Sequence, residues 1–376
     1  MINRQRIVEE FFELVQIDSP TLQERQIAEV LKSRLEALNF EVTEDRAGEA
    51  LGGNCGNLFA YLTGNVPDAP VLLLSAHMDT VQPGYNIQPV LKDGVITSAG
   101  PTILGADDKS GIVPILEALR VIQEQNLPHG DIQVLFCVAE EGGVNGSRNL
   151  DQTLLRADFG YILDSGGKPG TVIIEAPGQE RLNIVIKGKA SHAGVAPEQG
   201  VSAIVTAAQA ISGMRTGRID EETTANIGTI QGGRATNIVA DQVTITAESR
   251  SRNLEKMVQQ TAHMVETFKR CAKEMGAEVE IEVRRAYEPY VLDENSHVAQ
   301  LFTQVANKLG LTPQFTPSGG GSDANHINRY GVPCVVLGNG MAKSHTVDEY
   351  ILEEDLYQAT ELVVEIIKQA ALFHKE

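Results

Sequence analysis

Helical and strand-like patterns alternate along the first 176 residues, and this alternation restricts the possible folds more than any other feature. Apolar residues recur at helical spacing near the amino terminus and again after Asp108. Short apolar runs of strand length lie around them, at residues 57–62, 70–75, 131–139, 159–163 and 171–176. Such alternation predicts an α/β domain with helices on both faces of its sheet.

The pattern changes near Gly178. We predict strands at residues 180–188, 224–230, 242–249 and 277–284, and helices at 201–214 and 253–275. The resulting order β-α-β-β-α-β is typical of a ferredoxin-like α+β unit. Helices at 297–309 and 351–372 and a strand at 332–337 then resume the first pattern. We therefore predict an α/β domain over residues 1–177 and 292–376, interrupted by an inserted α+β domain over 178–291.

Length, charge and cysteine content narrow the class of protein. A chain of 376 residues is long enough for two domains. A formal net charge of −19 argues against nucleic acid or anionic membranes as partners. The chain has no apolar run long enough to cross a membrane and no signal-peptide pattern, so we expect a cytoplasmic protein. The four cysteines are far apart and are expected to be reduced core residues.

Polar residues follow the predicted strands of the α/β domain. The run Leu72-Leu-Leu-Ser75 resembles a buried strand, and His77 and Asp79 come directly after it. Residues two apart in an extended chain point to the same side. In open α/β sheets, ligands bind beyond the carboxyl ends of the strands. Other candidates at strand ends or at the start of a helix are Asp107, Asp108, Glu140, Glu141, Asp164 and His345.

Each candidate also has a simpler interpretation. Asp107 or Asp108 could cap a helix, Glu140 and Glu141 could be a solvated pair, and His345 could lie on the surface. Converging carboxylates, however, repel one another unless a cation lies among them. Imidazoles together with carboxylates suit zinc, or a similar ion such as cobalt or manganese. The chain lacks a G-x-S-x-G elbow, an H-E-x-x-H motif and a phosphate loop.

The ordered series of motifs resembles that of the two-zinc exopeptidases and amidohydrolases, a family that includes peptidase T, carboxypeptidase G and aminoacylase. The resemblance covers nearly the whole chain. Among the subgroups it is closest to the peptidase T-like proteins, because of Ala106-Asp-Asp-Lys-Ser-Gly111 and the aspartate at position 164. The motifs are His77-Met-Asp-Thr80, Gly105-Ala-Asp-Asp-Lys109, Glu140-Glu-Gly142, Ser191-His-Ala-Gly194 and Ser344-His345.

The resemblance implies two zinc ions per subunit, with cobalt or manganese as alternatives. His77 and Asp164 would bind one ion, Glu141 and His345 would bind the other, and Asp107 would bridge both. The peptide bond that follows Asp107 would be cis.

The resemblance also implies the roles of catalytic residues. Glu140 would be the general base for a water that bridges the zinc ions and attacks the substrate carbonyl, and Asp79 would orient His77. His192 would donate to the developing oxyanion. Substrate-binding positions would be Arg250 and Asn237. Independently of the resemblance, the glycine run Gly319-Gly-Gly321 predicts main chain that lies close to a substrate, so Gly321 is a further candidate. For Arg250 the simpler alternative is a strand arginine that pairs with Glu248.

The function that this resemblance implies is a zinc aminopeptidase acting on short peptides, similar to a tripeptide aminopeptidase. The nearest alternative is an amidohydrolase or carboxypeptidase that uses the same metals on N-acyl amino acids. A metal-binding protein without activity is disfavoured, because Glu140 and all the implied ligands are present. We also expect a homodimer through the inserted domain, because the edge strands of an isolated sheet need cover.

Overall fold

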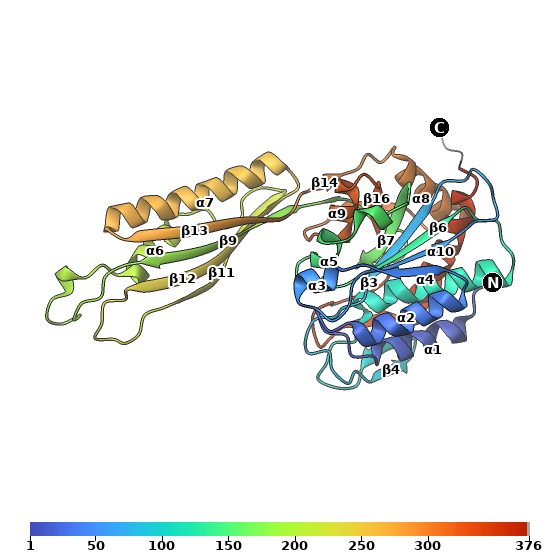
Figure 1. Cartoon of the computed structure of the whole chain (residues 1–376), viewed down its shortest axis with the longest axis horizontal. Helices are drawn as coiled ribbons and strands as arrows, with labels where there is room; N and C mark the ends of the chain where they lie inside the picture. Colours follow the sequence, from blue (N-terminus) through green and yellow to red (C-terminus); the bar gives the residue numbers. More distant parts are fainter. Residues whose placement is uncertain (374–376) are drawn as a thin grey trace. The chain divides into compact units, whose positions relative to one another are not determined.

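The computed structural model describes residues 1–373, which form two compact units (Figure 1). The first unit consists of Met1–Glu175, Val291–Ser318 and the chain from Ser322 onward. The second unit consists of Ala176–Tyr290 together with Gly319–Gly321. The predicted fold class is confirmed: a mixed central sheet with helices occupies the first unit, and a separate antiparallel sheet occupies the second.

The central sheet of the first unit places the ends of its parallel strands along one edge. Its strands are β1 (Glu41–Glu44), β2 (Leu58–Leu62), β3 (Leu72–His77), β6 (Ile132–Cys137), β7 (Phe159–Ser165), β8 (Thr171–Ala176), β14 (Tyr290–Val291), β15 (Gln314–Pro317) and β16 (Cys334–Gly338). The order is β1-β2-β6-β3-β7-β16-β8-β14, with β15 beside β8. The neighbours β6, β3, β7 and β16 run parallel, so their carboxyl ends lie at the same edge. Every residue of β3 and β6 is buried, as expected for strands covered on both faces.

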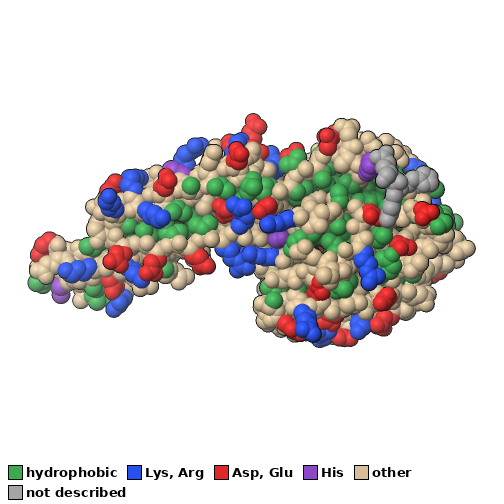
Figure 2. Space-filling view, turned by 45° about the horizontal axis from the view of Figure 1, so that its top comes forward, with side chains coloured by type: hydrophobic (Ala, Val, Ile, Leu, Met, Phe, Trp, Pro, Cys, Tyr) green, Lys and Arg blue, Asp and Glu red, His purple; other side chains and the backbone are tan. Residues whose placement is uncertain are grey.

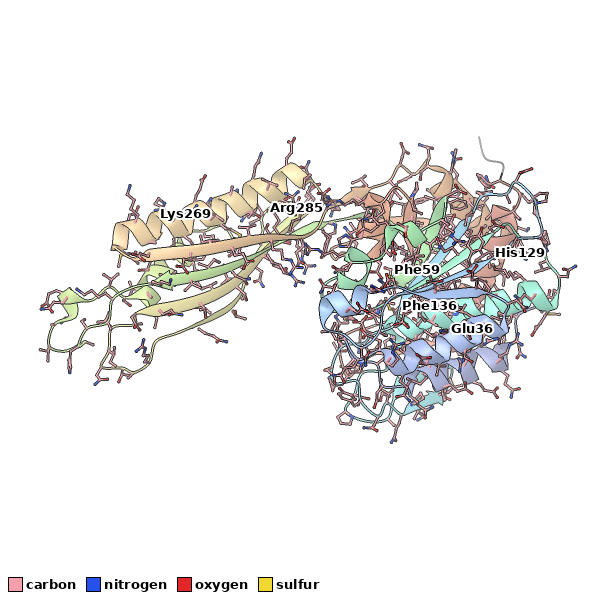
Figure 3. The ribbon with its side chains drawn as sticks, in the orientation of Figure 1. Glu36, Phe59, His129, Phe136, Lys269 and Arg285 are labelled. Atoms are coloured by element: carbon pink, nitrogen blue, oxygen red, sulfur yellow. The ribbon has the colours of Figure 1, made fainter. Side chains whose placement is uncertain are left out.

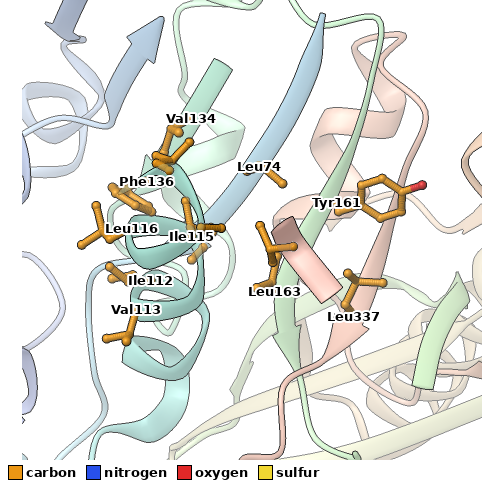
Figure 4. Packing of buried hydrophobic residues seen from close by; sticks show 14 of the residues in the cluster. Leu74, Ile112, Val113, Ile115, Leu116, Val134, Phe136, Tyr161, Leu163 and Leu337 are labelled. Carbon is orange, nitrogen blue, oxygen red and sulfur yellow. The ribbon is translucent and has the colours of Figure 1, made fainter. Parts of the chain in front are cut away.

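Helices of the first unit bury their apolar faces against this sheet and against one another. They are α1 (Arg4–Val15), α2 (Arg25–Ala37), α3 (Ala47–Leu51), α4 (Ala106–Glu124), α5 (Asn145–Arg148), α8 (His297–Lys308), α9 (Asp323–Arg329) and α10 (Glu353–Ala370). Helix α4 packs against β3 and β7, and α1 and α10 pack against α4. Figure 4 shows side chains of α4 in one buried cluster with residues of the strands. Burying one such side chain stabilises the fold by roughly 1.5–3 kcal/mol.

A small three-stranded sheet corrects one predicted boundary, the start of the last helix. Its strands, in the order β17-β5-β4, are β4 (Pro89–Lys92), β5 (Val95–Ser98) and β17 (Tyr350–Leu352). The last helix was predicted from residue 351, but Ile351 and Leu352 pair with β5 and the helix begins at Glu353. These strands are too short to give a clear periodicity, and their pairing depends on segments far apart in the chain.

The second unit has the predicted order β-α-β-β-α-β, with one further two-residue strand. Its elements are β9 (Gly178–Lys187), α6 (Ala203–Ser212), β10 (Gly217–Arg218), β11 (Thr223–Gly232), β12 (Gln242–Ser251), α7 (Leu254–Met275) and β13 (Glu278–Tyr287). All pairs are antiparallel, in the order β10-β11-β12-β9-β13. The Asn253 side chain accepts a hydrogen bond from Lys256 N and caps α7, and Gly276 ends this helix with a φ of 71°. Figure 3 shows Lys269 on α7 and Arg285 on β13.

Three further observations concern the surface and the core of the protein. Among residues 1–373, no helix combines the length and the apolar character needed to cross a membrane. Acidic and basic side chains are scattered over the visible surfaces of both units (Figure 2). The four cysteines are free and buried, as predicted, and Cys137 and Cys334 lie in β6 and β16.

Candidate metal centre

One group of possible ligands lies where β3 and β7 end and α4 begins. His77 is the last residue of β3, Asp164 lies near the end of β7, and Asp107 lies in the first turn of α4. His77 Nε2 is 2.9 Å from Asp107 Oδ1 and 3.7 Å from Asp164 Oδ1. These three residues can each offer a ligand atom, and the atoms all lie within 4.8 Å of one another.

A second group shares Asp107 with the first. His345 Nε2 is 2.9 Å from Glu141 Oε1 and 3.3 Å from Asp107 Oδ2. The ligand atoms of Asp107, Glu141 and His345 also lie within 4.8 Å of one another. Asp107 therefore presents Oδ1 to His77 and Oδ2 to His345. This is the arrangement of a carboxylate that can bridge two cations.

The hydrogen bond of His77 Nδ1 leaves Nε2 as the ring nitrogen that can bind a cation in the first group. His77 Nδ1 is 3.0 Å from the main-chain oxygen of Asp79. A carbonyl oxygen can only accept, so Nδ1 carries the proton and donates it. In the neutral form of His77, the lone pair of Nε2 would point toward Asp107 and Asp164, as a cation ligand requires.

The Asp79 side chain fixes the segment that contains Glu140 and Glu141. Its Oδ1 accepts a hydrogen bond from Glu140 N at 3.0 Å, and its Oδ2 accepts one from Glu141 N at 3.2 Å. Oδ1 is also 3.4 Å from His77 Nδ1. Asp79 therefore contacts His77, as the resemblance implies, and in addition holds the main chain of the predicted base and its neighbour.

Negative charge dominates the electrostatics of these groups. Burial, together with the charge of Asp164, raises the pKa of Glu140 well above its usual value. Burial likewise raises the pKa of Asp164. The carboxylates of Asp107 and Glu141 raise the pKa of His345 to about 10. Burial opposes the ionisation of Asp107, but the imidazoles of His345 and His77 hold its pKa below the usual range. A divalent cation would relieve this crowding of acidic groups.

The residues present fit a pair of divalent cations. Glu141 Oε1 is buried, lies beside His345 Nε2 without hydrogen-bond alignment, and receives no hydrogen bond from the described residues. A buried acceptor in this state is well suited to a metal ion. Imidazole nitrogens with carboxylate oxygens match the preferences of zinc, cobalt and manganese.

Asp108 supports the first group and was given no role from the sequence. Its Oδ2 accepts a hydrogen bond from His77 N at 3.2 Å. Its Oδ1 accepts one from Asn339 Nδ2 at 3.1 Å, and Asn339 also donates to the main-chain oxygen of Leu163 at 3.1 Å. Asp108 and Asn339 thus connect the ends of β3, β7 and β16. The peptide bond between Asp107 and Asp108 is cis, as the resemblance implies.

Two more buried groups near the site were missed by sequence reasoning. Glu24 Oε1 accepts a hydrogen bond from Ala139 N at 3.0 Å, and burial and the charge of Asp79 raise the Glu24 pKa to about 7. Lys109 Nζ donates to Met78 O at 2.7 Å, and burial lowers the Lys109 pKa to about 8. Lys109 belongs to a quoted motif, which could have drawn attention to it. Glu24 has no such local signal.

His192 and Asn237, two further residues predicted from the sequence, lie side by side in the second unit. The main-chain oxygen of Asn237 accepts a hydrogen bond from Ala193 N at 3.0 Å, and His192 forms a β-bridge with Ile238. Both His192 and Asn237 are exposed. Gly194 N donates to His192 Nδ1 at 3.2 Å, so the neutral imidazole carries its proton on Nε2. An exposed Nε2–H is free to donate.

Arg250 and Gly321 also belong to the second unit. Arg250 Nε donates to Glu248 Oε1 at 2.9 Å, which is the pairing that the sequence left open as the simpler alternative. Arg250 lines a cavity of about 390 Å³ with other polar residues of β9, β11 and β12. A Cβ atom on Gly321 would lie 2.3 Å from the ring of Tyr287, so a glycine is required for this contact.

The chain has an α/β sheet whose parallel strands end at two ligand groups, and the two groups share an aspartate. It also has an inserted antiparallel domain. Together these features define the class of two-metal peptidases. Residues 73–369 match peptidase family M20/M25/M40, and the chain belongs to this family.

Three relatives resemble the whole chain, and two of them have solved structures. The aminopeptidase PepT of Bacillus cereus ATCC 10987 is 47% identical, with a TM-score of 0.92 over 98% of this chain and 99% of that one. A tripeptidase of Staphylococcus aureus subsp. aureus Mu50 is 44% identical, with a TM-score of 0.96 over 99% and 100%. The uncharacterized protein YqjE of Bacillus subtilis strain 168 is 44% identical over 99% of this chain and 100% of its own.

Proposed function

We propose that this protein is a metal-dependent aminopeptidase that releases the amino-terminal residue of short peptides, with tripeptides as the preferred class. The observation that carries the proposal is the pair of ligand groups that share Asp107, with Glu140 next to the ligand Glu141 at the same strand end. The likeness over the full chain to an aminopeptidase PepT and to a tripeptidase supports the choice of substrate.

The reaction that we propose is hydrolysis of a peptide bond. When bound, two divalent cations, zinc or else cobalt or manganese, polarise the substrate carbonyl and lower the pKa of a water molecule. His77 and Asp164 would hold one cation, Glu141 and His345 the other, and Asp107 both. Glu140 would remove the proton from the attacking water and deliver it to the leaving amine. The hydrogen bond from Glu140 N to Asp79 keeps the base in place during both transfers.

Residues of the second unit would recognise the substrate and stabilise its charge. The exposed Nε2–H of His192 is a suitable donor for the oxyanion that forms on the carbonyl oxygen. Arg250 could bind a peptide carboxylate in a bidentate manner if that group replaced Glu248. Asn237 and Gly321 complete the proposed substrate-binding set.

A substrate comparison tests the function. Initial rates would be measured on Ala-Ala-Ala and on N-acetyl-Ala, each with zinc, cobalt or manganese. We expect free alanine from Ala-Ala-Ala and little hydrolysis of N-acetyl-Ala. Hydrolysis of the acylated substrate alone would instead favour an amidohydrolase or carboxypeptidase with the same metals.

A variant of Glu140 tests the assigned chemistry in the same assay. Glu140→Gln keeps the shape of the side chain but cannot take up the proton, so we expect a rate loss of at least about 10²–10⁴. Its metal content should equal that of the wild type, whereas the control Glu141→Ala should lose metal, as measured by elemental analysis. More than a tenth of the wild-type rate in Glu140→Gln would contradict the role of Glu140 as the base.

A further inference from the structure

Glu349 is a buried carboxylate that no part of the proposed reaction uses. It is 1% exposed and lies just before β17. Its Oε2 accepts hydrogen bonds from Leu104 N at 2.7 Å and from Gly105 N at 2.8 Å. Its Oε1 accepts one from Asp107 N at 3.0 Å. Hydrogen bonds to an ionised acceptor are about twice as strong as neutral ones, so this carboxylate firmly fixes the main chain that leads into Asp107.

The same glutamate belongs to the loop that presents His345. Ala342 and Tyr350 exchange main-chain hydrogen bonds of 3.0 and 3.1 Å and form the base of this loop. His345 lies at its tip, with a φ of +65° in the left-handed region, which residues other than glycine adopt infrequently. Glu349 follows His345 by four positions within the loop. It therefore ties the loop that carries one ligand to the main chain of the shared ligand, Asp107.

The two histidine ligands differ in how well the rest of the fold holds them. The His77 side chain is 1% exposed, lies at the end of a central strand and donates to Asp79 O. The His345 side chain is 54% exposed and lies on a surface loop. The position of His345 relative to Asp107 thus depends on how the loop is anchored. Glu349 is an anchor that bonds directly to the main chain of Asp107.

We infer that Glu349 is a positioning residue that sets cation affinity at the Asp107–Glu141–His345 group. This inference rests on the proposed function, because it presupposes that the two ligand groups bind divalent cations. Glu349 would not touch a cation or a substrate. It would act by holding His345 Nε2 and Asp107 Oδ2 at the separation of 3.3 Å seen in the structure.

Calorimetric titration of the metal-free full-length chain with Zn²⁺ tests the inference. The variant is Glu349→Gln, whose single oxygen can accept at most two of the three N–H groups and whose NH₂ group opposes the third. We expect one of the two zinc equivalents to bind about 10–100-fold more weakly, the usual effect of removing a partner behind a metal ligand. The other equivalent should be unchanged. If Glu349→Gln does not fold, Glu349→Asp, with a carboxylate one methylene shorter, takes its place with the same expectation.

Two further variants separate positioning from a general loss of stability. Asp131 is a carboxylate that accepts a hydrogen bond from Gly64 N at 2.8 Å just before β6, at the opposite end of that strand from Glu140. Asp131→Asn should lower the melting temperature without changing zinc affinity. In a His345→Ala background, the Asp107–Glu141–His345 group has already lost a ligand. Adding Glu349→Gln there should not further lower the affinity of the remaining zinc equivalent.

The outcomes distinguish this inference from the proposed function. A wild-type chain that binds no divalent cation would refute the proposed function, and this inference with it. If the wild type binds two zinc equivalents and Glu349→Gln binds both with unchanged affinity, this inference is refuted and the proposed function is not. A further loss in the His345→Ala background would also overturn it, because Glu349 would then act through Asp107 on both groups.

Discussion

Carboxylates around the candidate metal centre differ in what they contact. Asp107, Asp164 and Glu141 face the imidazoles. Asp79 and Glu349 accept hydrogen bonds from main-chain N–H groups, and Asp79 also lies beside His77. Leaving such a buried donor unsatisfied costs about 1–3 kcal/mol, so Asp79 and Glu349 also keep their segments rigid. Ligand geometry therefore depends on residues that would never touch the metal.

Substitution of a single residue, His192, tests its proposed role as oxyanion donor. We expect His192→Ala to lower kcat by about 10²–10³, the usual effect of losing one oxyanion donor. Metal content should not change, since His192 belongs to neither ligand group. Steady-state kinetics on a tripeptide together with elemental analysis would measure both. His263 of α7 serves as a control in the same unit, and His263→Ala should leave kcat unaltered. An unaltered kcat in His192→Ala would exclude the proposed role.

Three helices of the first unit are joined by one buried carboxylate. Glu10 of α1 accepts hydrogen bonds from Arg34 of α2 at 2.6 Å and from Arg120 of α4 at 2.5 and 2.6 Å. Glu10 is 5% exposed, so its charge depends on these two partners. A buried charge that loses its partner is strongly destabilising. Helix α4 begins at the metal centre, so this contact also fixes the far part of the helix that contains Asp107.

We predict that Glu10→Gln lowers the free energy of unfolding by roughly 1–3 kcal/mol, because Arg34 and Arg120 would lose the buried carboxylate between them and keep only their weaker partners Glu13 and Glu117. Glu13 offers a matched control. It also pairs with Arg34, at 2.7 Å, but its side chain is 65% exposed. Glu13→Gln should cost less than about 1 kcal/mol, as is usual for surface pairs. Urea unfolding of the three proteins would measure the difference. Equal losses for both variants would show that burial of Glu10 has no special effect.

The sheet of the second unit has two edges that differ in how well they could pair with a second copy of the chain. Strand β13 forms one edge and carries charged residues at alternating positions, which discourages pairing with another chain. At the other edge, β10 covers only the first part of β11. There Ile230 is 50% exposed, and Ile204 and Val205 of α6 are 44% and 47% exposed. An exposed apolar edge of this kind suits pairing with a second copy.

We therefore predict a homodimer formed through β11 and α6. Light scattering at micromolar concentration should give about twice the chain mass of 40.6 kDa. Ile230→Lys should shift the protein to monomer, because burying the added charge at the interface is costly. Val283 of β13 is 42% exposed and provides the control, and Val283→Lys should leave the dimer intact. A wild-type mass near that of one chain would rule the dimer out.

Much of the fold follows from local patterns. Apolar residues at helical or strand spacing define α7 and β3 without reference to the rest of the chain, and the predicted bounds of α7 differ from the observed ones by a single residue. The proximity of His77 to Asp164 was also predictable. Parallel strands end at one edge of their sheet, so polar residues that follow such strands meet there.

Other features depend on contacts between segments that are far apart in the chain, and no local sequence pattern predicts them. Glu349 lies 242 residues from Asp107, and Glu24 lies 115 residues from Ala139. A single buried glutamate has the same appearance in the sequence as a solvated one, because its partners are main-chain groups that every residue possesses. The amino-acid order determines which elements form and which residues follow them, whereas tertiary packing alone decides which main-chain N–H groups a buried carboxylate meets.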